Sequence, residues 1–506
     1  MSKNSLRIIH NGSSISLAEV PAPDTNEFLQ TIVDKTGLGW RISSLFGSPK
    51  GESVDLYCVM ASDHDGCLGI IRTNVRKTFP SITPDCPQAH LFEREIAEQC
   101  GLYPEGHPWL KPVRFQGPLK KSVTTGASAA ARNQLPGVMD YFRMDGEEIH
   151  EVAVGPVHAG IIEPGHFRFQ CRGEEVSHLE ISLGYQHRGI EARLIGAPNA
   201  NTISRMETIA GDTTIGHTSA YCMILEALSG CHVPARGEVL RGIALELERL
   251  ANHTGDLGAI AGDIGYLPTS SFCGRIRGDF LNMTAIICGS RFGRGLVRPG
   301  GVGFDVGQSQ IDELLKRLTA AKKDLENAVG LLWEAPSVMA RLEHVGIVSR
   351  ETAIELGLVG PAARACRLKR DIRRDHPYGI YQMSYIPAMT SDDGDVYGRS
   401  LVRWFEALRS LEFLDEQLRQ IPKGVLQNDI GPLAEGRIVV AMTEGWRGEI
   451  CHVAITDDTG KFARYKITDP SFHNWMGLAM ALRDEQISDF PLCNKSFNLS
   501  YCGFDL

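Results

Sequence analysis

The chain has 506 residues, 43% of them hydrophobic and 22% charged, which is the composition of an ordinary soluble globular protein with room for two or three domains. No apolar run approaches the roughly 20 residues that span a bilayer, and the start, MSKNSLRIIHNGSS, has no apolar signal-peptide core. We therefore expect a cytoplasmic protein that reaches a membrane only through partner subunits. The net charge of −9 is spread along the chain, which argues against nucleic-acid binding.

The thirteen cysteines predict a reduced chain in which most thiols are buried as small apolar residues. None is spaced Cys-x-x-Cys, and the closest pairs are too far apart for the usual local zinc or iron–sulfur site. These pairs are Cys58 with Cys67, Cys222 with Cys231, and Cys493 with Cys502. We expect most of the cysteines to be structural.

The first region predicts a β-hairpin followed by a charged helix. β-branched and apolar residues alternate with polar ones over 54–60 and 68–73, on either side of a DHDG turn. A helix is expected from residue 89 to about 100, after a Pro-broken loop. Its Glu-Arg-Glu run at 93–95 lies beside apolar side chains. From the residues alone, we interpret this run as the solvated face of a packed helix.

A stretch of small and polar residues separates this region from the rest. Residues 116–148, which include GPLKKSVTTGASAAARNQLPG, have little periodicity and are predicted to form a linker. Two short strands are expected beyond it, at 149–154 and 166–171. A domain boundary therefore falls here, with one unit over 1–115 and another over 149–506.

The clearest helical pattern runs from Gly237 to Gly258. Apolar residues recur there at intervals of three, four and seven, with Glu246, Glu248 and Arg249 between them. Further helices are expected at about 308–333, 362–374 and 396–420.

The end of the chain predicts a β-meander, a helix and a tail. Alternating residues separated by Gly-containing turns indicate three strands between 437 and 470. An apolar helix is expected from about Trp475, followed by an extended segment to the end of the sequence. The loop at 291–304, rich in Gly and Arg, is interpreted as a connector, although such a run also suits an anion.

The segment Leu183 to Glu226 contains the residues best suited to proton or electron chemistry. It has a His-Arg pair, an acid, an AGDTT turn and a second histidine beside apolar helical segments. Asp212 in the turn either caps the following helix or takes part in catalysis, since Asp and Thr are good N-cap residues. The helix after it is expected to be buried, with His217 hydrogen-bonded rather than ligating a metal.

Several motifs together resemble two subunits of respiratory complex I and their hydrogenase relatives. HLFEREIAEQCGLYPEGHPWLKPVRF resembles the signature of the 30 kDa-type subunit. GPVHAGIIEPGHFRF with LGYQHRGIEARL resembles the start of the large subunit of group 4 nickel–iron hydrogenases and of the 49 kDa-type subunit. The likeness continues through GLVGPAARACRLKRDIRRDHPYGIY, GDVYGRSLVRWFE and DPSFHNW. Both modules in one chain resemble the fused large subunit of formate hydrogenlyase and hydrogenase-4.

The resemblance implies an α+β protein: a small N-terminal α/β domain, then a hydrogenase-like domain with a central helix bundle and peripheral antiparallel strands. In that family two Cys-x-x-Cys pairs hold nickel and iron. Neutral small side chains cannot replace these thiolates, so the resemblance implies a member without a nickel–iron centre. A rearranged site from Cys222, Cys493 and Cys502 is an alternative, but a shift of one residue points a side chain in another direction. The four cysteine positions fall on Ala210, Thr213, Ser500 and Gly503.

Other family residues persist. Glu191 matches the acid that begins a proton route in hydrogenases, and burial would raise its pKa and let it pass protons near neutrality. It could instead pair with Arg188 or Arg193 on one helix face. His166 matches the histidine at the quinone headgroup of complex I, whereas the position of the quinone-contacting tyrosine falls on Gly211. The predicted catalytic residues are Glu191, Asp212 and His166, and the predicted cavity-lining residues are His187, Arg188, Ala210, Thr213, His217, Ser500 and Gly503.

The first functional hypothesis is a subunit of a membrane-associated, complex I-like and hydrogenase-related oxidoreductase. By resemblance, the chain docks on an iron–sulfur small subunit and on membrane antiporter-like and anchor subunits, at the cytoplasmic side of the inner membrane. It would couple electron transfer to a quinone-like or unknown acceptor with ion translocation. No cofactor is expected in this chain, and any NADH link runs through another subunit, because no Gly-x-Gly-x-x-Gly follows a strand. The alternatives are a non-catalytic scaffold subunit and an active hydrogenase with atypical ligands.

Overall fold

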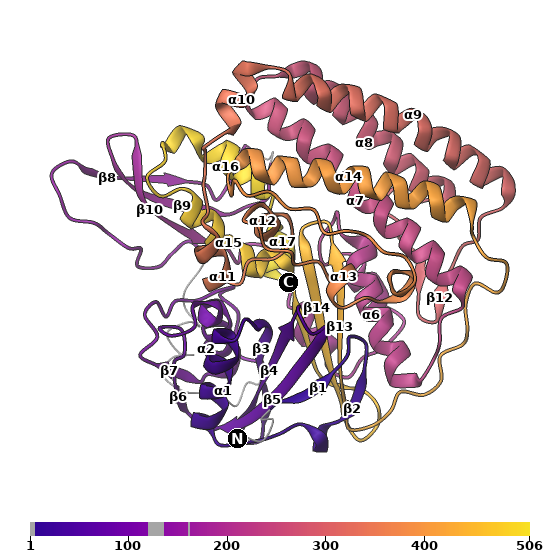
Figure 1. Ribbon diagram of the computed structural model, residues 1–506. Helices are drawn as coiled ribbons and strands as arrows, with labels where there is room; N and C mark the ends of the chain where they lie inside the picture. Colours follow the sequence, from indigo (N-terminus) through magenta and orange to yellow (C-terminus); the bar gives the residue numbers. More distant parts are fainter. Residues whose placement is uncertain (1–5, 120–135, 160–161) are drawn as a thin grey trace.

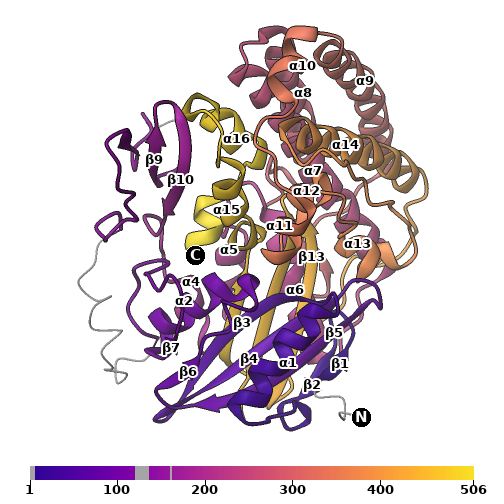
Figure 2. The same cartoon turned by 60° about the vertical axis from the view of Figure 1, so that its left-hand side comes forward.

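The computed structural model describes residues 6–119, 136–159 and 162–506. Figures 1 and 2 show an N-terminal sheet flanked by helices, a bundle of long helices, and a C-terminal sheet between the two. A small three-stranded sheet projects from the body beside the C-terminal helices (Figure 1). The fold is α+β, with antiparallel main sheets and a helix bundle, as the resemblance predicts.

The N-terminal region forms a four-stranded antiparallel sheet in the order β1-β5-β4-β3. The predicted hairpin is confirmed as β4 with β5, which pair Met60 with Gly69 near the turn. A helix that the sequence pattern does not indicate, α1, begins where Asp24 accepts the backbone N–H of Glu27 at 3.0 Å. The elements here are β1 (Arg7–Ile9), η1 (Leu17–Glu19), α1 (Thr25–Gly37), β3 (Arg41–Lys50), β4 (Ser53–Ser62), β5 (Cys67–Val75), β6 (Thr78–Pro80), η2 (Pro87–Ala89) and β7 (Tyr103–Glu105).

Helix α2 (His90–Cys100) is confirmed, but its charged residues are not solvated. The side chains of Glu93, Arg94 and Glu95 are at most 6% exposed. Arg94 donates to two backbone carbonyls of the segment that follows the helix, at 2.7 and 2.8 Å. The interpretation as a solvated face is wrong, because α2 lies between its own sheet and the C-terminal module and has partners on both sides.

The projecting sheet has the strand order β10-β9-β8, with β8 (Ile149–Val154), β9 (His166–Arg172) and β10 (Glu175–Ser182). The first two strands agree with the predicted ones, and the third completes the sheet. Of the expected linker, residues 120–135 lie outside the described residues. Residues 136–148 carry no helix or strand.

The bundle is built around α7, which packs against α8 and α14. The predicted apolar row of α7 is buried, including Leu240, Leu247 and Leu250. Helix α8 is not indicated by the sequence pattern, because glycines and polar residues in its interior blur the apolar period. Over the described residues, no helix combines the length and the apolar character needed to cross a bilayer. The helices are α7 (Ala235–Asp263), α8 (Leu267–Cys288), α9 (Gln308–Trp333), α10 (Pro336–Leu342) and α14 (Val396–Arg419).

The helix expected over 362–374 is instead two short helices, α12 (Gly360–Ala365) and α13 (Ile372–Asp375). Arg367 has a φ of 64°, in the left-handed region, which ends the first helix. Asp371 then caps the second by accepting a backbone N–H two residues on, at 3.0 Å. The other short elements nearby are β11 (Val297–Arg298), β12 (Gly301–Val302), α11 (Arg350–Glu355) and η3 (Gly379–Gln382).

The predicted meander forms three strands of the C-terminal sheet, whose order is β15-β14-β13-β2. The fourth strand, β2 (Ser14–Ser16), comes from the N-terminal region and pairs with Arg437 to Val439. The two modules therefore share a sheet. The three predicted strands are β13 (Arg437–Gly445), β14 (Gly448–Thr456) and β15 (Phe462–Thr468).

The final segment is helical, so the extended tail expected there is wrong. Helix α15 begins after Asp469, which accepts the backbone N–H of Ser471 at 2.8 Å. Ser500 caps the last helix in the same way, accepting the N–H of Gly503 at 2.9 Å. The helix that Ser500 starts has 5 residues, too few for a period to reveal it. The helices are α15 (Pro470–Ala481), η4 (Ile487–Asp489), α16 (Phe490–Phe497) and α17 (Tyr501–Asp505).

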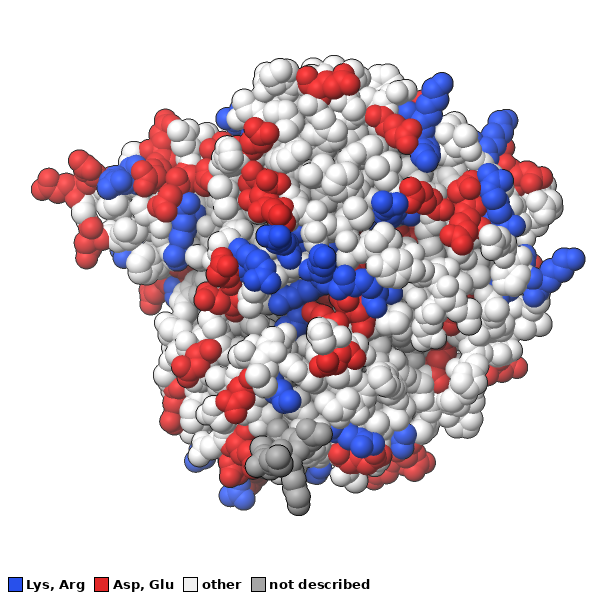
Figure 3. Space-filling view, in the orientation of Figure 1, with Lys and Arg blue, Asp and Glu red and all other residues white. Residues whose placement is uncertain are grey.

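The N-terminal sheet is joined to the rest by buried ion pairs. Asp63, in the turn between β4 and β5, lies 2.8 Å from Arg41, 3.6 Å from Arg370 and 3.2 Å from His376. The arginines hold the pKa of Asp63 far below its usual value, although burial acts to raise it. Figure 3 shows a band of Lys and Arg side chains across the middle of the same face, at the level of α11 to α13 in Figure 1.

Candidate functional site

Two loops that carry the family's metal-ligand positions meet at one place. The first lies between α5 (Thr202–Met206) and α6 (Thr214–Ser229), and the second leads into α17. Arg188 joins them, since its guanidinium donates to the carbonyls of Thr208, Ile209 and Cys502 at 2.6, 2.8 and 2.9 Å. The four predicted positions at 210, 213, 500 and 503 are thus brought together, and Arg188 binds backbone oxygens rather than a carboxylate.

The place of the last family cysteine is filled by an acid. A Cβ atom on Gly503 would lie 2.6 Å from Oδ2 of Asp469, closer than any real contact. Asp469 is buried and hydrogen-bonded to His217, its Oδ2 lying 3.1 Å from Nε2 of the ring. A carboxylate oxygen therefore stands where the family places a thiolate.

These residues do not fit a nickel–iron centre. Ala210 and Gly503 offer no ligand, while Thr213 and Ser500 offer neutral hydroxyls where soft thiolates are needed. Among the residues that the structure describes, no three His, Cys, Asp or Glu side chains converge as a metal site. No chemical step is therefore derived through such a centre.

The rearranged cysteine set does not assemble. Cys222 on α6 lies in the core that includes the helix bundle and near Arg241. Cys493 belongs to the other core, where its Sγ would meet a Cβ on Gly346 at 2.6 Å. Burial raises the pKa of the Cys493 thiol to about 12, and all thirteen thiols are free.

Asp212 is held by an arginine that the sequence pattern does not single out. Arg447, in the turn between β13 and β14, donates from Nη1 and Nη2 to the two Asp212 oxygens at 2.6 and 2.8 Å. The guanidinium stacks on Trp446 with 3.8 Å to the ring centroid. Burial acts to raise the pKa of Asp212, but Arg447 holds it below its usual value. The prediction that Asp212 caps α6 is wrong. Thr213 occupies the N-cap position of this helix, and its side chain accepts no backbone N–H of the first turn.

The start of α6 is capped from outside by Glu248 on α7. Its carboxylate accepts the N–H groups of Ile215 and Gly216 at 2.7 and 3.2 Å. Burial raises the pKa of Glu248 to about 8, although these two bonds act to lower it. A cavity of about 10 Å³, roughly enough for one water, lies between Glu248, Asp212 and Arg291. Glu248 is thus part of the site, whereas the sequence pattern identifies it only as a polar residue between the apolar positions of its helix.

Glu191, on α4 (Ile190–Leu194), has none of the predicted properties except burial. Its carboxylate lies 3.0 Å from Arg464 and 3.0 Å from Lys466, both on β15. Burial acts to raise its pKa, but Lys466, Arg464 and Arg114 together hold the pKa well below the usual range. The expected titration near neutrality is therefore wrong. The alternative pairing with Arg188 or Arg193 is also wrong, because the partners come from a strand far along the chain.

The Glu191 network joins the two modules. Gln99 on α2 donates to Glu191 at 3.2 Å, and Lys466 also lies 2.7 Å from Glu95 on α2. Glu95 pairs in turn with Arg114. The charged run of α2 thus provides one half of a buried ionic contact with the C-terminal sheet.

His166 lies on β9 and is 7% exposed. Its Nδ1 is 3.3 Å from the carbonyl of Gly155, and Arg168 donates to its Nε2 at 3.2 Å. Burial lowers its pKa. The preceding glycine packs on Tyr501, next to the second loop, with 2.6 Å from a built Cβ to the ring. His166 is therefore beside the site but held by its own strand.

His187 and His217 are both hydrogen-bonded, the first to the backbone and the second to other side chains. His187 Nδ1 lies 2.8 Å from the carbonyl of Asp505, and burial lowers its pKa. His217 is fully buried on α6 and hydrogen-bonded at both ring nitrogens, as predicted. Glu163, which the sequence pattern does not single out, accepts the N–H of Tyr501 at 3.3 Å and faces Cys502.

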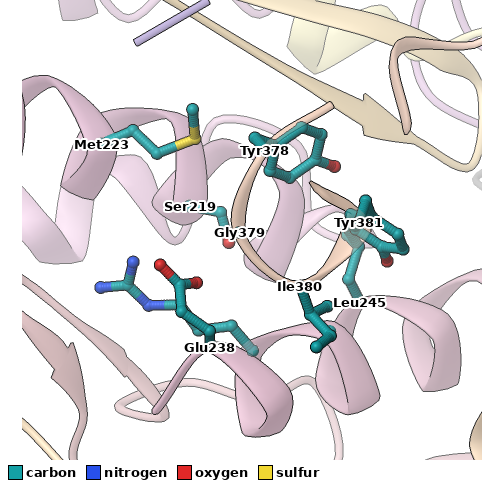
Figure 4. Close-up of a pocket in the computed structure, with 10 residues that line it drawn as sticks. Ser219, Met223, Glu238, Leu245, Tyr378, Gly379, Ile380 and Tyr381 are labelled. Atoms are coloured by element: carbon teal, nitrogen blue, oxygen red, sulfur yellow. The ribbon is translucent and has the colours of Figure 1, made fainter. Parts of the chain in front are cut away.

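The largest cavity described lies elsewhere. It has a volume of about 890 Å³, in the size range of ligand pockets, and an inner pocket continues from it. Figure 4 shows Glu238, in the first turn of α7, pointing toward Ser219 and Gly379. Burial raises the pKa of Glu238. Tyr381, on the inner wall, donates to Glu246 at 2.7 Å. None of the predicted site residues lines this cleft.

Comparison with known proteins identifies the family. Residues 18–128 match the family model of the respiratory-chain NADH dehydrogenase 30 Kd subunit, and residues 263–435 and 428–505 match that of the 49 Kd subunit. The carbon monoxide-induced hydrogenase of Rhodospirillum rubrum is 30% identical over 351 residues, covering 69% of this chain and 97% of that protein. The chain therefore belongs to the family of complex I 49 kDa-type subunits and related hydrogenases, with a 30 kDa-type module in the same polypeptide.

Two further relatives align across both modules. Formate hydrogenlyase subunit 5 of Escherichia coli (strain K12) is 28% identical over 499 residues, covering 96% of this chain and 87% of that protein. The C/D subunit of the NADH-quinone oxidoreductase of Bdellovibrio bacteriovorus is 24% identical over 451 residues, covering 81% of this chain and 80% of that protein. The resemblance to fused hydrogenase and complex I subunits is confirmed.

Proposed function

We propose that the chain is the large subunit of a membrane-associated oxidoreductase complex that works without a nickel–iron centre. In this proposal an iron–sulfur small subunit supplies electrons, and a quinone-like acceptor is reduced beside Asp212 and Arg447. Membrane antiporter-like and anchor subunits couple the reaction to ion translocation at the cytoplasmic side. Membership of the family supports the kind of complex, because its members include hydrogenases and NADH-quinone oxidoreductases.

One observation carries the nickel-free part of the proposal. The Asp469 carboxylate lies where a side chain at residue 503 would have to stand, 2.6 Å from a built Cβ. Nickel and iron in this family need deprotonated thiolates at such positions. Because the place is filled and its acid is held by His217, restoring a ligand would require the surrounding side chains to move.

The remaining polar groups suit reduction of an acceptor that gains charge and protons. Arg447 is fixed by Asp212 on one side and Trp446 on another, so its cation is oriented before any acceptor binds. A fixed cation stabilises negative charge that develops on an acceptor oxygen. His166 and Asp212 are the proposed proton-handling groups at this site. Glu191 contributes a fixed negative charge instead of a transferable proton.

The test is purification of the intact complex through a tag on this chain. We expect no stoichiometric nickel, no hydrogen evolution or uptake, and reduction of a short-chain quinone by the chemically reduced complex. The change Arg447→Lys should lower that activity on the order of 10²-fold, because it loses the bidentate fork that orients the charge. Arg317→Lys, in an exposed ion pair with Glu313, is the matched control and should have no effect. Stoichiometric nickel with hydrogenase activity would contradict the proposal. A complex that reduces no acceptor would favour the scaffold alternative.

A further inference from the structure

Four buried side chains form a continuous hydrogen-bonded chain that starts at Asp469. His217 Nε2 lies 3.1 Å from Asp469 Oδ2, and His217 Nδ1 lies 3.1 Å from His452 Nε2. His452 Nδ1 lies 2.9 Å from the Tyr465 hydroxyl oxygen. All four side chains are at most 2% exposed, and they come from α6, β14, β15 and the start of α15. We name this set the Asp469 chain.

The hydrogen bonds that link the four members of the Asp469 chain can form in two arrangements that differ by one proton, with Tyr465 protonated in both. In the first, Tyr465 donates to His452 Nδ1, His452 Nε2–H donates to His217, and His217 Nε2–H donates to the carboxylate. In the second, His217 carries both ring protons and donates to His452 Nε2, while His452 Nδ1–H donates to the tyrosine oxygen. Each ring nitrogen keeps a partner in both states. No heavy atom has to move to take up or release the proton.

The surroundings of each member are consistent with the first arrangement. Burial acts to raise the pKa of Asp469, but His217 and Arg447 hold it below its usual value, so this acid is ionised. Burial lowers the pKa of His452 well below its usual value, and neighbouring His217 adds to this while the charge of Glu191 opposes it. Burial raises the pKa of Tyr465, whose titratable neighbours are Tyr221, Cys222 and Cys451.

The two ends of the chain open toward different regions. Asp469 lies beside Gly503 and near Arg447, at the proposed acceptor site. At the other end, the ring of Tyr221 is 6.4 Å from that of Tyr465. The hydroxyl of Tyr221 hydrogen-bonds Thr202 at the start of α5, next to Asn201 on the surface. Tyr221 and Thr202 are themselves buried, so the Tyr465 end is separated from the surface near Asn201 by these two side chains, and its contact with Tyr221 is a ring contact.

We propose that the Asp469 chain is a proton relay that carries one proton from the Tyr465 end to the acceptor site. The Tyr465 O–H bond breaks as His452 Nδ1–H forms, and His452 Nε2–H breaks as His217 Nδ1–H forms. The tyrosine oxygen regains a proton, supplied by solvent water, from the side of Tyr221. His217 Nε2–H then breaks as an O–H bond forms on Asp469, which passes the proton to the reduced acceptor. Both rings then carry their proton on Nδ1, so before the next transfer each releases that proton and takes one up on Nε2, with no net change in the number of protons.

The relay deepens the proposed function and rests on it for its acceptor, since reduction of a quinone by two electrons consumes two protons. The first test therefore uses the intact complex and a short-chain quinone. We expect Tyr465→Phe and Asp469→Asn to lower kcat on the order of 10²-fold with KM unchanged, and to increase the solvent isotope effect, because proton delivery becomes limiting. Asparagine still caps α15, which protects the fold.

The matched control is Tyr381→Phe, which removes another buried hydroxyl, bonded to Glu246 at 2.7 Å and outside the chain. It should keep the wild-type kcat and isotope effect. If Tyr465→Phe behaves like this control in both measurements, the relay is wrong.

A second test needs no turnover. In the complex labelled with nitrogen-15 in its histidine rings, NMR should show His452 as the Nε2–H tautomer where His217 holds one ring proton and as the Nδ1–H tautomer where His217 holds two. The His452 signals are assigned as those that disappear in the variant His452→Gln. A His452 that keeps one tautomer throughout the titration would overturn the relay even if the complex reduces quinones. A complex that reduces no acceptor would contradict the proposed function. The NMR measurement of the two histidine rings would still test the relay.

Discussion

Glu191 and Glu248 are two glutamates beside the same site, and their chemistry is opposite. Glu191 faces Arg464 and Lys466, each at 3.0 Å, and its pKa is well below the usual range. Glu248 accepts backbone N–H groups and makes no ion pair with any residue that the structure describes; Asp212 lies nearby, Arg249 only partly offsets the effect of burial, and the pKa of Glu248 is raised to about 8. The family pattern directs attention to Glu191, but the physical property expected there occurs at Glu248. Burial raises a carboxyl pKa only where no cation compensates it.

The largest expected effect comes from removing the charge of Glu191. Glu191→Gln removes the carboxylate that pairs with Arg464 and leaves Lys466 with Glu95 alone, which should destabilise the fold by about 3–5 kcal/mol. Unfolding in guanidinium chloride at neutral pH measures it. Glu151→Gln breaks an ion pair whose side chains are 32% and 22% exposed, and should cost about 0–1 kcal/mol. Equal losses in the two variants would show that the Glu191 network does not hold the modules together.

The stability difference between wild type and Glu191→Gln should also depend on pH. A carboxyl whose folded pKa is depressed stabilises the fold above its unfolded pKa of about 4.3, and loses that contribution as pH falls further. We therefore expect the difference in unfolding free energy between wild type and Glu191→Gln to be constant above this value and to shrink toward acid. A difference that grows on acidification would contradict the pairing with Arg464 and Lys466.

A smaller effect is expected where Asp469 fills the site. Gly503→Ala brings a methyl against a carboxylate fixed by His217 and Ser471, so we expect a loss of about 1–3 kcal/mol from overpacking. Gly211→Ala in the facing loop meets no atom within 4 Å and should be close to neutral. Thermal unfolding of both variants checks this. Two neutral substitutions would mean that the loops have room for a larger group.

The smallest effect is the pH dependence contributed by Glu248. Its folded pKa of about 8 exceeds the unfolded value, so the native state binds an extra proton between the two and stability falls as pH rises through this window. Glu248→Gln removes the titrating proton and should remove this slope, although its single amide oxygen replaces only one of the two oxygens that accept N–H groups. Because the carboxylate keeps some exposure, about 1 kcal/mol is expected. Unfolding curves at mildly acidic and mildly alkaline pH test it, and an unchanged slope would refute the raised pKa.

The sequence predicts elements that repeat a period and misses those set by single residues. Helices α7, α9 and α14, the β4–β5 hairpin and the meander follow from periodicity. The short helix α17 depends on the Ser500 cap, and the break in 362–374 depends on the φ of Arg367. In both of these missed features, the conformation or cap of one residue determines the structure, and the local apolar periodicity is too weak to predict it.

For the site, the loop positions were predictable and their partners were not. Aligning the two motifs with the metal-binding motifs of the family predicts that residues 210, 213, 500 and 503 lie close together. Arg447, Asp469 and His452 come from the C-terminal sheet and its exit, and no local pattern indicates which distant side chain they meet. The same limit explains α2, because a Glu-Arg-Glu run has the same letters whether it faces water or a buried lysine.

The pairing of β2 with β13 has a consequence for how the two modules stay together. Three residues near the start of the chain cover the edge of a sheet more than 400 residues later, and an uncovered edge is a template for pairing with other molecules. In one polypeptide, the covering strand is present at the millimolar effective concentration typical of a tethered segment. Cutting the chain within 116–148 would turn this closure into a bimolecular association that weakens on dilution. Fusion of the modules thus makes protection of that edge independent of how much protein a cell contains.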